Sequence, residues 1–212
     1  GRGWRVEEGY NMDSVMLKPG DGGEWPSGQK AIPRFVVYAL EGVRDVDVSR
    51  WRLVVRGRRG TVTLAYKDLA DSSYSLGVET FHCVTGWSVK GVEWGGIRLG
   101  EILSRVDSMD GGWVVFKSIG GYTTVVPLPY ASEGVIVTSI NGRPLEARHG
   151  FPARFLNPRL YGWKSAKWLA EVEVRDEYVD GVWEALAYHE RGLVAAEERF
   201  KIRNPEALEI LD

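Results

Sequence analysis

The stretch Phe81-His82-Cys83-Val84-Thr85-Gly86-Trp87-Ser88, residues 81–88, determines which fold and function this chain is expected to have. Its Cys83 stands at the end of an apparent strand and before a glycine-containing turn, where a side chain can be presented to a cleft. Free cysteine is also among the most buried residue types, packing as a small hydrophobe. Taken alone, the stretch therefore favours structural burial of Cys83 over a functional thiol.

Cys83 is the only cysteine among the 212 residues. One cysteine forbids an internal disulfide, and it excludes the zinc sites and iron–sulfur clusters that need several thiolates. A metal bound to this chain can therefore take at most one sulfur from the protein. The lack of disulfides fits a cytoplasmic location best.

The composition excludes several classes of protein. With 27 basic and 29 acidic residues the net charge is −2, so no general positive field would attract nucleic acid or an anionic membrane. Hydrophobic residues make up 44% of the chain, which is typical of a globular rather than a disordered protein. No apolar run approaches the roughly 20 residues of a membrane-spanning helix, and no signal peptide is recognised. We expect a soluble protein with no membrane span and no nucleic-acid partner.

Short hydrophobic runs predict several β-strands and few helices. The predicted strands are rich in Val and aromatic residues or alternate apolar with charged residues, and they cover 35–40, 51–56, 60–66, 113–119, 122–128, 134–140 and 171–175. The clearest helix is 97–106, because its Leu, Ile and Val residues recur at helical spacing. Asn141-Gly142 predicts a two-residue hairpin turn, since both residues tolerate positive φ.

This pattern predicts an α+β fold class, with β-rich mixed sheets and short helices. Residues 1–33 contain many Gly and Pro residues with little periodicity, so we expect an extended lead-in there. Residues 34–212 are expected to form a single domain, because one hydrophobic core can keep growing to roughly 250 residues.

Two further clusters carry cationic side chains. The first is His149 to Arg154, and the second, Tyr161 to Trp168, includes Lys164, Ser165 and Lys167. Arginine, lysine and serine side chains beside glycine are what an anionic phosphate needs. The alternative is that these are ordinary solvated residues flanking a strand, and composition alone favours that alternative.

The clusters occur in an order that resembles the catalytic domain of the sulfite oxidase family of molybdopterin enzymes. The similarity covers nearly the whole chain, and its specificity comes from several spaced motifs agreeing. Besides residues 81–88, the matching stretches are Trp94-Gly95-Gly96-Ile97, Gly121-Tyr122-Thr123-Thr124 with Pro127-Leu128, Asn141-Gly142-Arg143-Pro144-Leu145, 149–154, 161–169 and 25–57.

The resemblance implies the sulfite oxidase molybdopterin-binding fold and one molybdenum held by a single molybdopterin, by oxo ligands and by one cysteine. Cys83 occupies the position of that cysteine. A thiolate is a soft donor suited to a metal that already carries sulfur ligands, so the chemistry agrees with the residue type. With the resemblance, the ligand interpretation of Cys83 outweighs simple burial. Tungsten is possible in place of molybdenum.

The resemblance also implies roles for other residues. Tyr122 aligns with a catalytic tyrosine that reaches the oxo group of the metal. Lys164, Ser165 and Lys167 fall on the loop that grips the terminal phosphate, partly through backbone amides. The expected pterin contacts are Phe35, Val37, Ser118, His149 and Arg154.

Two departures from sulfite oxidases proper bear on the substrate. This chain has Val37-Tyr38 where they carry Arg-Asn, and Ser88 where they carry a second substrate-binding arginine. A site for doubly charged sulfite should supply cations, so these replacements make sulfite a doubtful substrate.

The predicted function is an oxotransferase that moves an oxygen atom to or from a small substrate, either a sulfur oxyanion or an S-oxide. Such an enzyme exchanges its electrons with a separate partner protein. Two alternatives stay open at the level of sequence. One is a non-catalytic pterin-binding or cofactor-storage module, and the other is a structural β-rich domain that shares only the fold.

Overall fold

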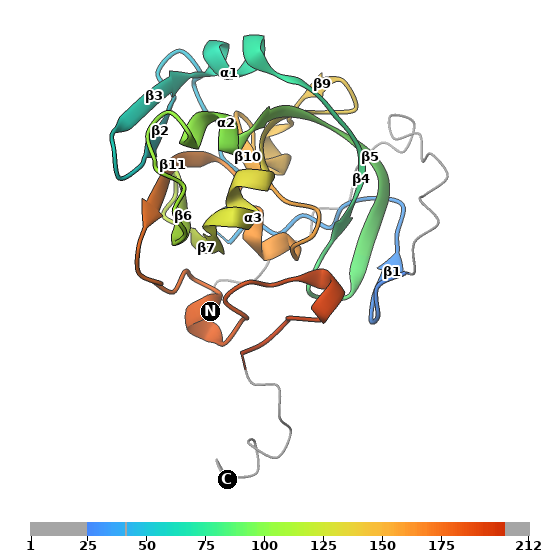
Figure 1. Ribbon diagram of the computed structural model, residues 1–212. Coiled ribbons are helices and arrows are strands. Elements are labelled where there is room, and N and C mark those ends of the chain that lie inside the picture. The colour runs from blue at the N-terminus through green and yellow to red at the C-terminus, as the bar shows by residue number, and fades with distance from the viewer. Residues whose placement is uncertain (1–24, 41, 202–212) are drawn as a thin grey trace.

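Two β-sheets carry the fold in the computed structural model, which describes residues 25–40 and 42–201 (Figure 1). Most of the predicted lead-in, residues 1–24, lies outside the described residues, as do residue 41 and residues 202–212. In Figure 1 the strands of one sheet gather on the left and those of the other on the right, with two short helices between them.

The first sheet has five strands in the order β3-β2-β11-β6-β7. Their bounds are β2 Arg52–Arg56, β3 Thr61–Ala65, β6 Trp113–Ser118, β7 Thr123–Pro127 and β11 Leu169–Arg175. Strand β11 runs parallel to β2 and antiparallel to β6. Burial alternates along β2, which buries Leu53 and Val55, leaves Val54 half-buried between them and exposes Arg52 and Arg56.

The second sheet has six strands, of which β1, β5, β8 and β10 follow one another, while β4 also pairs with β5 and β9 with β8. Their bounds are β1 Lys30–Ala31, β4 Tyr74–His82, β5 Trp87–Arg98, β8 Val135–Ile140, β9 Arg143–Pro144 and β10 Arg154–Leu156. Strand β1 is parallel to β5, and the other pairs are antiparallel. Residues 30–31 of the expected lead-in thus contribute a strand.

Three short α-helices and four 3-10 turns complete the regular structure of the described residues; the α-helices are α1 Tyr66–Ser72, α2 Leu99–Leu103 and α3 Leu128–Glu133. The main core lies between the sheets, where Phe116 of β6 stacks on Phe155 of β10 with ring centres 4.1 Å apart. Leu103 of α2 and Leu128 of α3 are fully buried in the same cluster. Within the described ranges, no helix has the length and apolar character needed to cross a membrane.

The predicted α+β class with mixed sheets and few short helices is confirmed. Asn141 and Gly142 both have positive φ and join β8 to β9, as the sequence indicates. The predicted strand at 35–40 is wrong, because this segment forms no ladder and instead packs its side chains on the second sheet. The predicted helix 97–106 is shorter, since residues 97–98 belong to β5 and the helix ends at Leu103.

Candidate functional site

Cys83 begins the four-residue turn that joins β4 to β5. Its N–H donates to the carbonyl of Trp87 at 2.8 Å, and its carbonyl accepts from the N–H of Gly86 at 3.1 Å. Gly86 has φ 96°, a conformation that favours glycine. The side-chain amide of Gln29 donates to the same carbonyl at 3.0 Å. The backbone of Cys83 is therefore fixed by both the turn and a neighbouring segment.

The side chain of Cys83 lines a pocket with a volume of about 320 Å³. The residue is only 6% exposed, and its burial raises the pKa of the thiol. The hydroxyl of Thr85 lies 3.2 Å from its sulfur and opposes that rise. Both properties considered for Cys83 from the sequence are therefore present: the thiol is buried, and it also faces a cavity.

Two buried cations line the same pocket at some distance along the chain. Arg154, on β10, is 5% exposed and donates to the carbonyls of His149 at 3.2 Å and Ser165 at 3.4 Å. Lys167 donates through Nζ to the carbonyls of Tyr38 at 2.7 Å and Arg148 at 3.1 Å. Burial lowers the pKa of Arg154 to about 10, and burial together with Arg154 lowers that of Lys167 to about 7.

No carboxylate lines this pocket among the residues that the structure describes. Nor does any described carboxylate form an ion pair with Arg154 or Lys167, and the buried Nε of Arg154 has no hydrogen-bond acceptor there. Buried charges in proteins are normally paired, because removing them from water is unfavourable. The arrangement therefore fits an anionic ligand that supplies the missing negative charge.

The remaining expected pterin contacts also lie at the pocket. Burial first, and Arg154 second, lower the pKa of His149 to about 3, so its imidazole is neutral at neutral pH. Phe35 lies against this imidazole, with ring centres 5.3 Å apart. The hydroxyl of Ser118, at the end of β6, donates to the carbonyl of Lys167 at 2.6 Å. Val37 and Ser165 complete the lining.

Lys164 is the one expected site residue that does not line the pocket. Its side chain is fully buried, and Nζ contacts Glu184 at 2.7 Å and the carbonyl of Val125 at 2.6 Å. Its backbone N–H donates to Tyr161, and that of Ser165 donates to Gly162, inside the 3-10 turn η3 Gly162–Lys164. The ammonium group of Lys164 is therefore directed to Glu184 and not to the pocket where a phosphate was expected.

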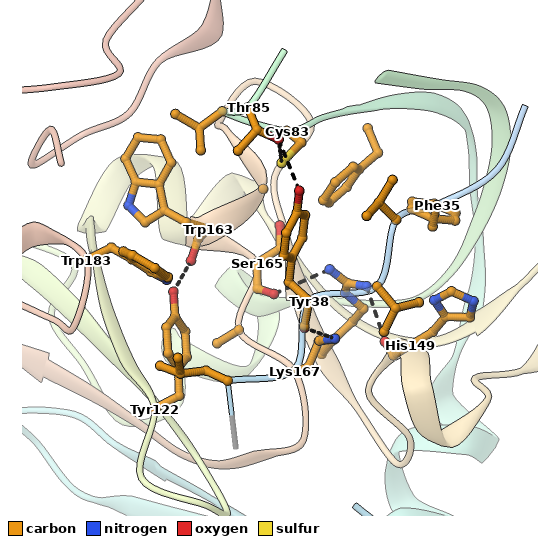
Figure 2. A pocket seen from close by; sticks show the side chains of 18 of the residues that line it. Phe35, Tyr38, Cys83, Thr85, Tyr122, His149, Trp163, Ser165, Lys167 and Trp183 are labelled. Atoms are coloured by element: carbon orange, nitrogen blue, oxygen red, sulfur yellow. Dashed lines mark hydrogen bonds between the residues drawn. The ribbon is translucent and has the colours of Figure 1, made fainter. Parts of the chain in front are cut away.

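Tyr122 lines the pocket, and its hydroxyl donates to the carbonyl of Trp163 at 2.5 Å. Figure 2 shows Tyr38 nearer the middle of the pocket, with its hydroxyl directed toward Cys83 and Thr85. Trp163 and Trp183 form a wall on the other side.

Several lining residues were not predicted from the sequence. Thr85 lies only two positions from Cys83, and Trp163 lies inside the expected phosphate loop, so the sequence motifs contain a signal for both. Trp183 and Tyr188 come from the 177–201 segment, which carries no periodic signal.

Ser88, which stands where sulfite oxidases carry a substrate-binding arginine, does not face the pocket. It is completely buried, and its hydroxyl donates to Gln29 at 2.9 Å and lies 2.7 Å from Nδ1 of His82. It does not line the pocket, whereas Val37 and Tyr38 do. Only the replacement at residues 37–38 therefore bears on the polarity of the lining.

The side chains present are poor in metal ligands. Within residues 25–40 and 42–201, no group of three or more His, Cys, Asp or Glu could hold a metal ion. A metal at Cys83 must therefore bring most of its own ligands. A single soft thiolate together with unpaired cations fits a metal carried by an anionic, sulfur-bearing cofactor.

Comparisons with known proteins identify the family of the chain. The sequence model of the family "Oxidoreductase molybdopterin binding domain" matches residues 40–183. The uncharacterized oxidoreductase YuiH of Bacillus subtilis is 35% identical over 158 residues, covering 73% of this chain and 80% of that protein. A putative protein-methionine-sulfoxide reductase subunit, YedZ1 of Azospira oryzae, is 29% identical over 188 residues, covering 86% and 70%.

The fold also matches a solved structure. The crystal structure of the sulfane dehydrogenase SoxCD from Paracoccus pantotrophus superimposes with a TM-score of 0.61 over 71% of this chain and 44% of that chain. The sequence identity of 17% means that this likeness supports the fold alone.

Proposed function

We infer the function of the pocket from one premise: the chain belongs to the family of oxidoreductase molybdopterin-binding domains, and it is a molybdopterin-dependent oxidoreductase of the sulfite oxidase family. The inference is that the enzyme transfers an oxygen atom to or from a small sulfur substrate, with residues 34–212 as the domain that does so. The observation that carries it is one pocket that joins the only cysteine to two buried cations without carboxylates.

The residues of the pocket fit the cofactor. When bound, the molybdenum cofactor supplies two-electron oxygen-atom transfer. Cys83 would provide the protein's sulfur ligand, and Arg154 and Lys167 would offset the negative charge of the phosphate. The contacts proposed for the pterin are Phe35, Val37, Ser118, His149 and Ser165.

Lys164 has a different proposed role from the one expected. Because its ammonium group is held by Glu184, it would shape the turn that presents Trp163 and Ser165 to the pocket. Tyr122 would hold the carbonyl of Trp163 from the other side. The Tyr122 hydroxyl and the Lys164 ammonium group then need not move when a ligand binds.

An uncharged S-oxide is the substrate class that the lining favours over a sulfur oxyanion. Part of the pocket wall is formed by Trp163, Trp183 and Tyr188, which are neutral and aromatic. Such walls bind apolar substituents well but offer no counter-charge to a doubly charged anion. A putative methionine-sulfoxide reductase subunit among the relatives supports the same class.

Electrons would be exchanged with a separate protein, a proposal supported by the relative YedZ1, which is described as a subunit. Molybdenum is the expected metal, and tungsten stays a possibility because a single thiolate does not discriminate between them. The cytoplasmic location remains a prediction from the cysteine content.

The test begins with protein purified from a host that makes molybdopterin. We expect stoichiometric molybdenum, turnover of methyl aryl sulfoxides with a reduced dye, and slow or absent oxidation of sulfite with an oxidised dye. The Cys83→Ser variant should lose turnover while its circular dichroism stays that of the native protein. Full activity of this variant would refute the ligand assignment. Bound molybdenum that cannot be reduced or oxidised would instead indicate a cofactor-storage module.

A further inference from the structure

The hydroxyl of Thr85 lies between the sulfur of Cys83 and the hydroxyl of Tyr38. Thr85 Oγ1 is 3.2 Å from Cys83 Sγ and 3.5 Å from Tyr38 Oη. All three residues line the pocket, and the dashed lines in Figure 2 join the Thr85 hydroxyl to the Cys83 sulfur and to the Tyr38 hydroxyl. They come from separate parts of the sequence, since Tyr38 belongs to the irregular segment before β2, whereas Cys83 and Thr85 share one turn.

The direction of these hydrogen bonds follows from the number of protons. A cysteine bound to a metal is a thiolate, which can only accept a hydrogen bond. Thr85 has one hydroxyl proton, which it would donate to that sulfur. The lone pairs of its oxygen then accept the proton of the Tyr38 hydroxyl. A single arrangement satisfies all three groups, running from Tyr38 to Thr85 to Cys83.

We propose that Thr85 tunes the redox potential of the bound metal by donating a hydrogen bond to the Cys83 sulfur, and that Tyr38 positions Thr85 for this. The proposal rests on the function inferred above, with Cys83 as the metal ligand. Tyr38 acts only through Thr85, so it is a positioning residue.

The physical consequence is a change in electron donation by the sulfur. A hydrogen bond to a ligand sulfur withdraws electron density from it, which makes the attached metal easier to reduce. Cys83 is only 6% exposed, so water competes little for its lone pairs. Hydrogen bonds in such a poorly solvated place are stronger than in water, and a second donor behind the first strengthens it further.

Redox titration of the molybdenum-loaded protein tests the proposal, with the metal followed by electron paramagnetic resonance. Thr85→Val keeps the shape of the side chain but lacks the hydroxyl, and its midpoint potential should shift to a lower value. Thr85→Ser keeps the donor and should restore a potential close to that of the native protein. Tyr38→Phe should shift the potential in the same direction as Thr85→Val but by less.

A second measurement uses the metal-free full-length chain, made in a host without molybdopterin. With one cysteine, the chain has a single S–H stretching band, so the vibrational spectrum reports on Cys83 without labelling. In the metal-free protein the sulfur carries a proton, which it can donate to the Thr85 oxygen 3.2 Å away. Thr85→Val removes this acceptor and should move the band to higher frequency, whereas Thr85→Ser keeps it and should not. Circular dichroism of each variant verifies that it is folded.

The outcomes separate the two inferences. An unchanged midpoint potential in Thr85→Val, at native metal content, overturns the tuning role even if the S–H band moves. A lowered potential supports it, with or without a band shift. If the native protein binds no stoichiometric molybdenum or tungsten, the proposed function fails, and the tuning role fails with it. The band shift would then support only the hydrogen bond.

Discussion

At the scale of single residues, Lys167 is a pocket cation whose charge is expected to change near neutral pH. Its pKa of about 7 results from burial and from the neighbouring Arg154, so the ammonium group gains or loses its proton near neutral pH. The pKa of Arg154, about 10, leaves that side chain charged under the same conditions. His149, with a pKa of about 3, stays neutral. Lys167 is thus the one pH-dependent cation among these three.

We expect the metal-free protein to bind sulfate more tightly at low pH. Sulfate keeps its charge across this range, and one charge-assisted hydrogen bond fewer corresponds to a roughly tenfold weaker affinity between about pH 6 and about pH 8. Isothermal titration calorimetry at both pH values measures the difference. Lys167→Met should bind sulfate weakly and equally at both. An affinity of the native protein that does not change with pH would contradict the pKa assigned to Lys167.

At the scale of elements, the pairing of β5 with β8 depends on a glycine. Gly96 faces Val137 where the register of the two strands shifts, and a Cβ at this position would overlap the carbonyl oxygen of Ile136. The neighbour is backbone, so it cannot turn aside as a side chain would. Strand β5 begins at the pocket turn and, beyond this register shift, places Ile97 in the main core.

The Gly96→Ala substitution should therefore lower the free energy of unfolding by about 2 kcal/mol, the usual effect of overpacking. Gly60→Ala is the matched control, because a Cβ there would meet nothing within 4 Å. Urea unfolding followed by tryptophan fluorescence measures both variants. Equal midpoints for Gly96→Ala and Gly60→Ala would mean that the strands can separate enough to admit a methyl group.

A second element-scale feature is the buried ion pair between the turn η3 and the 3-10 turn η4 Glu184–Leu186. Lys164 and Glu184 are both completely buried and lie 2.7 Å apart. The carboxylate also accepts from the hydroxyl of Thr124 on β7 at 2.6 Å. Three segments that carry lining residues, among them Tyr122, Trp163 and Trp183, are thereby held together.

Replacing only one residue of this ion pair should lower the free energy of unfolding more than replacing both residues. Lys164→Met leaves a buried carboxylate unpaired, and we expect it to lower the free energy of unfolding by about 3 to 5 kcal/mol. The double variant Lys164→Met, Glu184→Leu should recover much of that loss, because two apolar side chains can replace a buried pair. Urea unfolding of both variants measures this. A double variant no more stable than the single one would mean that the fold depends on the charges themselves.

Some of the secondary-structure elements could be predicted from the sequence and others could not. Alternation and turn chemistry predict β2, β3, β6 to β8 and β11, because each buries one face or is joined by a residue with positive φ. The strand that ends before Cys83 and the glycine-containing turn after it were predicted, but strand β5 was not, since five glycines between residues 77 and 96 interrupt the hydrophobic pattern of the hairpin. The helix at 97–106 is shorter than its spacing indicates, because β5 extends through Arg98 to pair with β8.

Part of the candidate site could likewise be predicted from the sequence, and part could not. Motif matching finds Cys83, Arg154 and Lys167, which the fold brings to one pocket. It does not find the orientation of Lys164, because the partner of that side chain lies twenty residues away along an irregular segment. Trp183 and Tyr188 are likewise brought to the pocket by a segment without periodicity, and only the three-dimensional structure identifies them.

At the scale of the whole molecule, the pocket lies where the two sheets meet. Cys83 follows β4, and Arg154 is on β10, so both belong to the six-stranded sheet. Ser118 ends β6, and Lys167 leads into β11, so these belong to the five-stranded sheet. A ligand that contacts all four side chains would connect the sheets and offset the buried positive charge between them.

Cofactor loading should therefore stabilise the molecule as a whole. Tight binding to the folded state alone adds about 4 kcal/mol at a thousandfold excess over the dissociation constant, which for a chain of this size raises Tm by roughly 10 °C. Thermal unfolding of protein from hosts with and without molybdopterin synthesis measures the gain. Arg154→Met should show a smaller gain, and its metal-free form should be no less stable than the native metal-free protein, because the variant removes a buried charge that lacks a counter-ion. Equal Tm values for the loaded and metal-free native protein would mean that the cofactor does not bind the folded state in preference to the unfolded chain, which would contradict a cofactor held by side chains of both sheets.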